Sequence, residues 1–220
     1  MSKVCYLIGA GEHYDNIICK PDSDDFVIAV DGGYEYAVNH NITPDLIMGD
    51  FDSVSKNPCD NTDIPTITFP AKKDYTDMML AADKAIENGC DTILIYGGTG
   101  GRFDHTIANI QLLSWISNKG ARAFLFDKKH TITAITNTTL EIKKNSFDKH
   151  NGFMHSSVSG YISIFSLSDV SEGVTINGLK YCTDNATLNR LHALGTSNEF
   201  MNRDCEIRVK NGTLLIIAEQ

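Results

Sequence analysis

Long apolar runs are missing from this 220-residue chain. No stretch approaches the roughly 18 apolar residues that suggest a membrane span. The short apolar stretch at residues 4–8 is followed by Gly-Ala-Gly-Glu and not by the small-residue pattern of a signal-peptide cleavage site. The sequence therefore predicts a protein without a membrane partner.

Positive charge and paired cysteines are also scarce. The 19 Lys and Arg residues stand against 28 Asp and Glu residues, and the formal net charge is −9. A general nucleic-acid binder needs a basic face, so this charge balance argues against that class. The six cysteines are scattered and form no C-x-x-C. Such spacing is typical of reduced thiols, and we expect a cytoplasmic protein without a disulfide framework or a zinc site.

What the first half of the chain does contain is an alternation of strand and helix patterns. Apolar, partly β-branched stretches at 4–8, 26–30, 46–48, 64–69, 92–96 and 121–126 predict buried strands. Helical patterns follow several of them, most clearly over 74–88 and from about 105 to 118. This alternation predicts an α/β domain over residues 1–127, with a mostly parallel sheet and helices on both faces.

After residue 127 the pattern changes to short strands. They are expected at 131–136, 140–142, 161–167, 174–176, 206–209 and 213–218, with no convincing helix among them. Asn211-Gly212 between the last two is the strongest hairpin signal in the chain. The polar segment 143–160 reads as a long exposed connection. Residues 128–220 therefore predict a second domain, an all-β sandwich.

One segment of the chain, residues 45–77, is rich in aspartate. From Asp45 to Asp77 there are seven Asp, no Glu and three Lys, so the local formal charge is −4. Asp50 and Asp52 lie in G-D-F-D-S, and Asp74 and Asp77 lie in K-K-D-Y-T-D. Either pair alone suits a turn or a helix cap. Two crowded pairs instead favour a bound cation such as Mg²⁺, which bridges carboxylates to substrate phosphates.

A glycine-rich loop follows the expected strand at 92–96. It reads G-G-T-G-G-R-F-D-H over residues 97–105 and leads into a helix. Strand, glycine loop and helix start is the arrangement that holds phosphate through backbone N–H groups. The loop lacks the G-K-[ST] ending of a P-loop, and no complete G-x-G-x-x-G follows the first strand. Asp31, at the end of the second expected strand, is either a ligand-binding residue or a helix cap.

Taken in order, these motifs resemble the thiamine pyrophosphokinase family. The matching pieces are D-G-G (31–33), P-D-L-I-M-G-D-F-D-S (44–53), K-D-Y-T-D (73–77), G-G-T-G-G-R-F-D-H (97–105), G-L-K-Y (178–181) and S-N-E-F (197–200). The resemblance covers nearly the whole chain. It implies an α/β catalytic domain that binds ATP and Mg²⁺, a β-sandwich domain that binds thiamine, and a homodimer with the thiamine site at its interface. It also implies transfer of the diphosphate of ATP to the thiamine hydroxyl, giving thiamine diphosphate and AMP.

The resemblance also assigns residues. The metal and phosphate carboxylates fall on Asp50, Asp52, Asp74 and Asp77, and Lys73 and Arg102 join them as catalytic residues. The family's nucleotide loop falls on residues 98–104, and Asp31 and His105 are added from their positions in the sequence, so the expected ATP-binding set is Asp31, Gly98, Thr99, Gly100, Gly101, Arg102, Asp104 and His105. The thiamine-binding set is Tyr181, Ser197 and Asn198, with Tyr181 where family members can have a Trp that stacks on thiamine.

Two other classes of function remain open on the sequence. A Mg²⁺-dependent phosphohydrolase could use Asp50 or Asp52 as a nucleophile, although it would not need the glycine loop or S-N-E-F. A module that binds thiamine or nucleotide without catalysis could be built on the same fold. For the kinase reading, Mg²⁺ on the Asp cluster would neutralise the phosphate oxygens, and either Asp74 or Asp77 could accept the alcohol proton.

Overall fold

The computed structural model describes residues 3–17, 19–50, 63–70, 72–144 and 160–219. The chain forms two compact units. Residues 1–112 and 125–128 make up the first unit, and residues 113–124 and 129–220 make up the second. The predicted boundary after residue 127 stays a prediction. Among the described residues, no helix combines the length and the apolar character that crossing a bilayer requires.

A parallel sheet forms the centre of the first unit. Its strands lie in the order β5-β1-β2-β3-β4 and every adjacent pair is parallel. They span Val4–Ile8 (β1), Phe26–Val30 (β2), Leu46–Gly49 (β3), Thr66–Thr68 (β4) and Thr92–Tyr96 (β5). Every residue of β1, β3 and β5 is buried. This burial explains why these strands read as apolar runs and not as alternating patterns.

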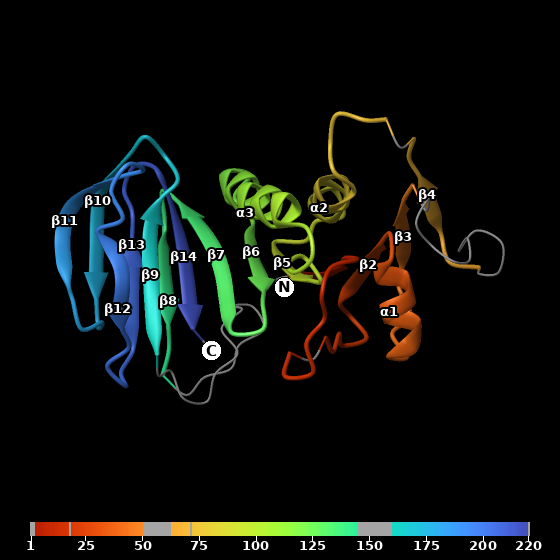
Figure 1. Cartoon of the computed structure of the whole chain (residues 1–220), viewed down its shortest axis with the longest axis horizontal. Helices are drawn as coiled ribbons and strands as arrows, with labels where there is room; N and C mark the ends of the chain where they lie inside the picture. Colours follow the sequence, from red (N-terminus) through yellow and green to blue (C-terminus); the bar gives the residue numbers. More distant parts are fainter. Residues whose placement is uncertain (1–2, 18, 51–62, 71, 145–159, 220) are drawn as a thin grey trace. The chain divides into compact units, whose positions relative to one another are not determined.

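Three helices follow strands of this sheet: α1 (Gly33–Asn39), α2 (Asp77–Glu87) and α3 (Phe103–Asn118) (Figure 1). The expected start of α2 at Asp74 is wrong. The helix begins at Asp77, because the Thr76 side chain accepts a hydrogen bond from the Met79 N–H and caps it. Asp74 therefore lies ahead of the helix and does not share its first turn with Asp77. The predicted end is confirmed, since Gly89 follows with φ 79°.

The second unit contains two antiparallel sheets, drawn as neighbouring layers in Figure 1. One has the order β12-β9-β14-β7 and the other β11-β10-β13-β8. Their strands are β7 (His130–Thr136), β8 (Thr139–Ile142), β9 (Tyr161–Ser166), β10 (Val170–Asn177), β11 (Thr183–Asn189), β12 (Gly195–Glu199), β13 (Cys205–Arg208) and β14 (Thr213–Glu219). β6 (Arg122–Phe126) precedes them. One buried cluster draws side chains from both sheets, among them Ile162, Ile164, Val174, Ile207, Leu214 and Ile216.

The predicted fold class is confirmed: a mainly parallel sheet with helices, followed by an antiparallel β-sandwich region. Two details of the sandwich were not predicted. β11 and β12 are so polar (T-D-N-A-T-L-N and G-T-S-N-E) that no apolar alternation marks them. The Asn211-Gly212 hairpin is wrong, because β13 pairs with β10 and β8 whereas β14 pairs with β7 and β9. The turn joins the two sheets and not two paired strands.

Candidate functional site

Two aspartates lie where neighbouring parallel strands end. Asp31 follows β2 and Asp50 follows β3. The Asp31 N–H donates to the Met48 carbonyl at 2.9 Å, and the Asp50 N–H donates to Asp31 Oδ1 at 3.2 Å. Asp31 adopts a left-handed backbone with φ 49°. A Cβ at Gly49 would collide with Asp31 Oδ1, so glycine is what lets the carboxylate reach the end of β3.

Lys73 joins Asp50 to Asp77 at the start of α2. Its Nζ lies 2.8 Å from Asp77 Oδ2 and 3.9 Å from Asp50 Oδ2, with about one seventh of the lysine and Asp77 side chains exposed. The ion pair with Asp77 is close, but its angles are too poor for a hydrogen bond. The second Asp77 oxygen, Oδ1, is buried and has no hydrogen-bond partner among the described residues.

This group places three carboxylates near the ammonium of Lys73. Burial, together with the carboxylates of Asp77 and Asp50, raises the pKa of Asp31 to about 6. The Asp50 N–H and the Lys73 ammonium oppose that rise without cancelling it. A hard cation would relieve the repulsion and would give Asp77 Oδ1 a partner.

The predicted four-aspartate metal set is only partly visible. Asp50 and Asp77 lie close enough to share Lys73, but Asp74 is exposed and Asp52 lies outside the described residues. Within the described ranges, no group of three or more His, Cys, Asp or Glu side chains is placed to hold a metal ion. The carboxylate that completes the group is Asp31, which the sequence suggested only as an ATP-binding or capping residue. Its position after a strand was the signal that could have placed it here.

The glycine loop follows β5, and its backbone carbonyls are held by the protein. The Gly97 carbonyl accepts from the Gly11 N–H and the Thr99 carbonyl accepts from the Glu12 N–H, both at 2.8 Å. The Gly98 carbonyl accepts from Asn109 Nδ2 at 2.7 Å. Gly97, Gly100 and Gly101 all have positive φ, from 61° to 81°. This backbone path is open to glycine and strained for other residues.

Arg102, Asp104 and His105 lie on the exposed start of α3. Arg102 pairs with Asp104 through two contacts, Nη2 to Oδ2 at 2.6 Å and Nε to Oδ1 at 3.1 Å. The Arg102 guanidinium lowers the pKa of Asp104 to about 2. Asp104 Oδ1 also accepts from the His105 N–H at 3.1 Å. The guanidinium is thus oriented by its neighbour at the mouth of the loop.

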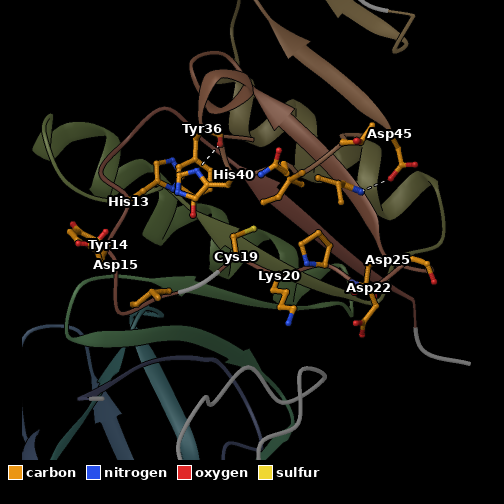
Figure 2. A pocket seen from close by; sticks show the side chains of 17 residues that line it. His13, Tyr14, Asp15, Cys19, Lys20, Asp22, Asp25, Tyr36, His40 and Asp45 are labelled. Atoms are coloured by element: carbon orange, nitrogen blue, oxygen red, sulfur yellow. Dashed lines mark hydrogen bonds between the residues drawn. The ribbon is translucent and has the colours of Figure 1, made fainter. Parts of the chain in front are cut away.

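A hollow of about 750 Å³ lies elsewhere in the first unit (Figure 2). It is lined by residues of the segments 13–27 and 36–45, and none of the predicted site residues is among them. His13 and His40 stack on Tyr36 with ring centroids 3.6 and 3.9 Å away. Two rings that close to a third cannot share one of its faces, so Tyr36 lies between the two histidines. Part of the wall of this hollow is therefore a packed stack of three rings.

In the second unit, two of the predicted thiamine-binding residues are in contact. Asn198 Oδ1 accepts from the Tyr181 N–H at 2.9 Å, and Asn198 Nδ2 donates to the Tyr181 carbonyl at 2.7 Å. Asn198 is buried, whereas the Tyr181 side chain is exposed with Lys180 over its ring. Ser197 is exposed and its N–H donates to Ser163 Oγ at 3.1 Å. Asn198 therefore holds the backbone beside an available aromatic ring.

Comparison with known proteins defines the class. Residues 21–125 match the family model described as "Thiamin pyrophosphokinase, catalytic domain". Residues 137–214 match "Thiamin pyrophosphokinase, vitamin B1 binding domain". A match to a catalytic-domain model over the α/β part is thus followed by a match to a vitamin-binding-domain model over the β part.

Whole-chain relatives agree. The thiamine pyrophosphokinase of Bacillus subtilis is 31% identical over 86% of this chain and 85% of its own length. Thiamin pyrophosphokinase 1 of Caenorhabditis elegans is 25% identical over 80% of this chain and 69% of its own. The crystal structure of the B. subtilis protein superposes with a TM-score of 0.81 at 28% identity, covering 100% of this chain and 99% of that one. The chain belongs to the thiamine pyrophosphokinase family, whose members are enzymes.

Proposed function

We propose that the chain transfers the β,γ-diphosphate of ATP to the hydroxyethyl group of thiamine, giving thiamine diphosphate and AMP. The observation that carries this proposal is the Asp31–Asp50–Lys73–Asp77 group at the carboxyl ends of β2 and β3. The glycine loop leaves the same edge of the sheet, after β5. In the order β5-β1-β2-β3 the direction of winding reverses at β1, and such a switch point is where open α/β sheets bind ligands.

The reaction transfers the diphosphate group from an oxygen of AMP to the hydroxyl oxygen of thiamine. The thiamine hydroxyl oxygen forms a bond to the β-phosphorus, and the bond from that phosphorus to the oxygen bridging to the α-phosphorus breaks. The electron pair of that bond leaves with AMP, and the hydroxyl proton passes to a carboxylate of the group. Chemistry of this kind depends mainly on position and charge. Lys73 and Arg102 are the cations we assign to the developing negative charge.

The carboxylates Asp50, Asp52, Asp74 and Asp77 are the residues we assign to Mg²⁺. The partnerless Asp77 Oδ1 and the raised pKa of Asp31 support a cation here. When bound, Mg²⁺ would neutralise oxygens of the β- and γ-phosphates. The residues that we assign to ATP are Asp31, Gly98, Thr99, Gly100, Gly101, Arg102, Asp104 and His105.

Buried amides of the loop support the nucleotide assignment. Gly98 and Thr99 are buried, and the carbonyls of Gly97 and Thr99 accept from the N–H groups of Gly11 and Glu12. Successive backbone amides in a glycine loop between a strand and a helix are a common anion site. We assign Tyr181, Ser197 and Asn198 to thiamine, and we propose that the enzyme is a cytoplasmic homodimer with the thiamine site at its interface.

A product assay with ATP, Mg²⁺ and thiamine tests the proposal. We expect AMP and thiamine diphosphate in a one-to-one ratio. ADP with a monophosphate product would show ordinary kinase chemistry on this fold. Phosphate release that does not depend on thiamine would indicate a phosphohydrolase. Binding of thiamine or ATP without turnover would indicate a non-catalytic binding module.

A further inference from the structure

Residues 9–14 run from the end of β1 along the glycine loop. The loop carbonyls at 97 and 99 are bound by the amides of Gly11 and Glu12, as described above. In a trans peptide the C=O of one residue and the N–H of the next point in opposite directions. The N–H groups of Gly98 and Gly100 must therefore point away from residues 9–14. The segment fixes which way the loop presents its donors.

A side-chain link strengthens this arrangement at Thr99, which is 5% exposed. The Thr99 hydroxyl donates to Asp127 Oδ1 at 3.2 Å. Tyr14 Oη lies 3.4 Å from the same Thr99 oxygen. The one hydrogen of the Thr99 hydroxyl is donated to Asp127, and Tyr14 hydrogen-bonds both Thr99 and Asp127. Burial raises the pKa of Tyr14, as do the charge and the hydrogen bond of Asp127, against the Thr99 hydrogen bond, which lowers it.

The site machinery derived so far does not use Tyr14 or Asp127, which lie 85 and 28 residues from Thr99 along the chain. They come from two different sides, one from the segment after β1 and one from the segment after β6. Their shared target is the residue at the centre of the loop. Backbone bonds alone would fix the peptide planes of residues 97–99, whereas this link also fixes the Thr99 side chain.

We propose that Tyr14 is a positioning residue for the nucleotide: through Thr99, and with Asp127, it holds residues 97–100 so that their amides face the phosphates of ATP. The inference rests on the proposed function, because it takes the loop as the phosphate-binding element. Tyr14 itself touches no reacting atom. Its loss should therefore weaken the binding of ATP and leave the binding of thiamine nearly unchanged.

The test combines Tyr14→Phe, which removes only a hydroxyl, with Thr99→Val and Thr99→Ser. We expect Tyr14→Phe and Thr99→Val to raise the KM for ATP about three- to tenfold, the range of one lost hydrogen bond. The KM for thiamine should change by less than about twofold on the same scale. Thr99→Ser keeps the hydroxyl and should restore the KM for ATP to near the wild-type value.

A double variant and a matched control sharpen the result. If both residues act through one hydrogen bond, Tyr14→Phe combined with Thr99→Val should be no worse than the more severe single variant. Thr133→Val also removes a buried hydroxyl, which donates to the Ala123 carbonyl at 2.7 Å, but it lies in the second unit. That control should lower stability without a selective effect on ATP.

A binding measurement separates failure of this inference from failure of the proposed function. Titration with α,β-methylene-ATP, in which the bond to be broken is blocked, reports the dissociation constant without turnover. A wild-type protein that makes no thiamine diphosphate would overturn the proposed function, while this titration would still test Tyr14. Unchanged ATP affinity in Tyr14→Phe and Thr99→Val would overturn the inference. Equal losses for ATP and thiamine, or multiplicative effects in the double variant, would overturn it too.

Discussion

The two units differ in how fully their polar groups are paired. In the second unit, the buried hydroxyls of Ser166 and Ser171 bond to each other at 2.8 Å, and the Asn198 side chain bonds to both polar backbone groups of Tyr181. Arg208 Nε, buried without a partner, is an exception among the described residues. In the first unit, the Asp77 Oδ1 and Lys73 Nζ atoms have no hydrogen-bond partner among the described residues.

This difference separates scaffold from site. A buried polar group without a partner costs free energy, so such groups are rare in folded proteins unless a function requires them. They persist at the carboxyl edge of the parallel sheet, next to carboxylates that already repel one another. A ligand that brings a cation and phosphate oxygens would give the unpaired atoms at that edge their partners. The second unit instead presents the exposed ring of Tyr181, whose backbone N–H and carbonyl are already hydrogen-bonded to Asn198.

The largest effect is expected from Asp77→Asn, which changes a carboxylate in the Asp31–Asp50–Lys73–Asp77 group. The amide keeps the shape but removes the charge that pairs with Lys73 and that we assign to Mg²⁺. Turnover should fall about 100-fold or more, the scale of losing one preorganised electrostatic contact. Steady-state kinetics at saturating ATP and thiamine measure it.

Asp83→Asn is the matched control for that variant, because Asp83 is an exposed acid on the same helix. It should retain wild-type turnover. Circular dichroism should show both variants folded. A near wild-type rate for Asp77→Asn would remove Asp77 from the catalytic assignment and would weaken the contrast between the two units.

A smaller effect is expected from Asn198→Ala in the second unit, where the polar groups are hydrogen-bonded. The change leaves the N–H and the carbonyl of Tyr181 without their partners, at a cost of about 1–3 kcal/mol in the free energy of unfolding. The KM for thiamine should rise while the KM for ATP stays near wild type. Urea unfolding and kinetics measure the two quantities.

Asn177→Ala, at an exposed position of β10, controls for loss of an amide in the same unit. It should change neither KM and should leave the unfolding midpoint nearly unchanged. If Asn198→Ala raised the KM for ATP as much as that for thiamine, the assignment of this region to thiamine would fail.

The smallest effect is a pH dependence at His13, on the wall of the hollow. Burial lowers the pKa of His13 from its usual 6.5, and nearby His40 lowers it further, against a hydrogen bond with the Gly9 carbonyl that raises it. The unfolded chain then binds this proton more tightly, so stability falls as the pH drops below about 6.5. His13→Gln should flatten that fall between about pH 7 and 5.

The measurement is the thermal unfolding midpoint at several pH values, with the slope and not the absolute value compared. His192→Gln, at an exposed position of the second unit, is the matched histidine control. An identical slope for wild type and His13→Gln would show that burial of His13 does not couple its protonation to folding.

The sequence by itself determined the fold class and most of the strands. Buried parallel strands such as β1 and β5 are continuous apolar runs, and helix α2 stops just before Gly89 as its pattern predicts. These are local properties, set by burial and by backbone preferences within a few residues. The motifs also placed Asp50, Asp77, Lys73 and the glycine loop among the candidates.

Only the tertiary structure decided which of these residues meet. Thr76 caps α2, which separates Asp74 from the helix, and the left-handed turn at Asp31 carries that carboxylate to the end of β3. The meeting of Tyr14, Thr99 and Asp127, and the pairing of β13 and β14 into different sheets, depend on contacts between distant segments. No local pattern encodes such contacts, because their free energy exists only once both partners have been brought together by the rest of the fold.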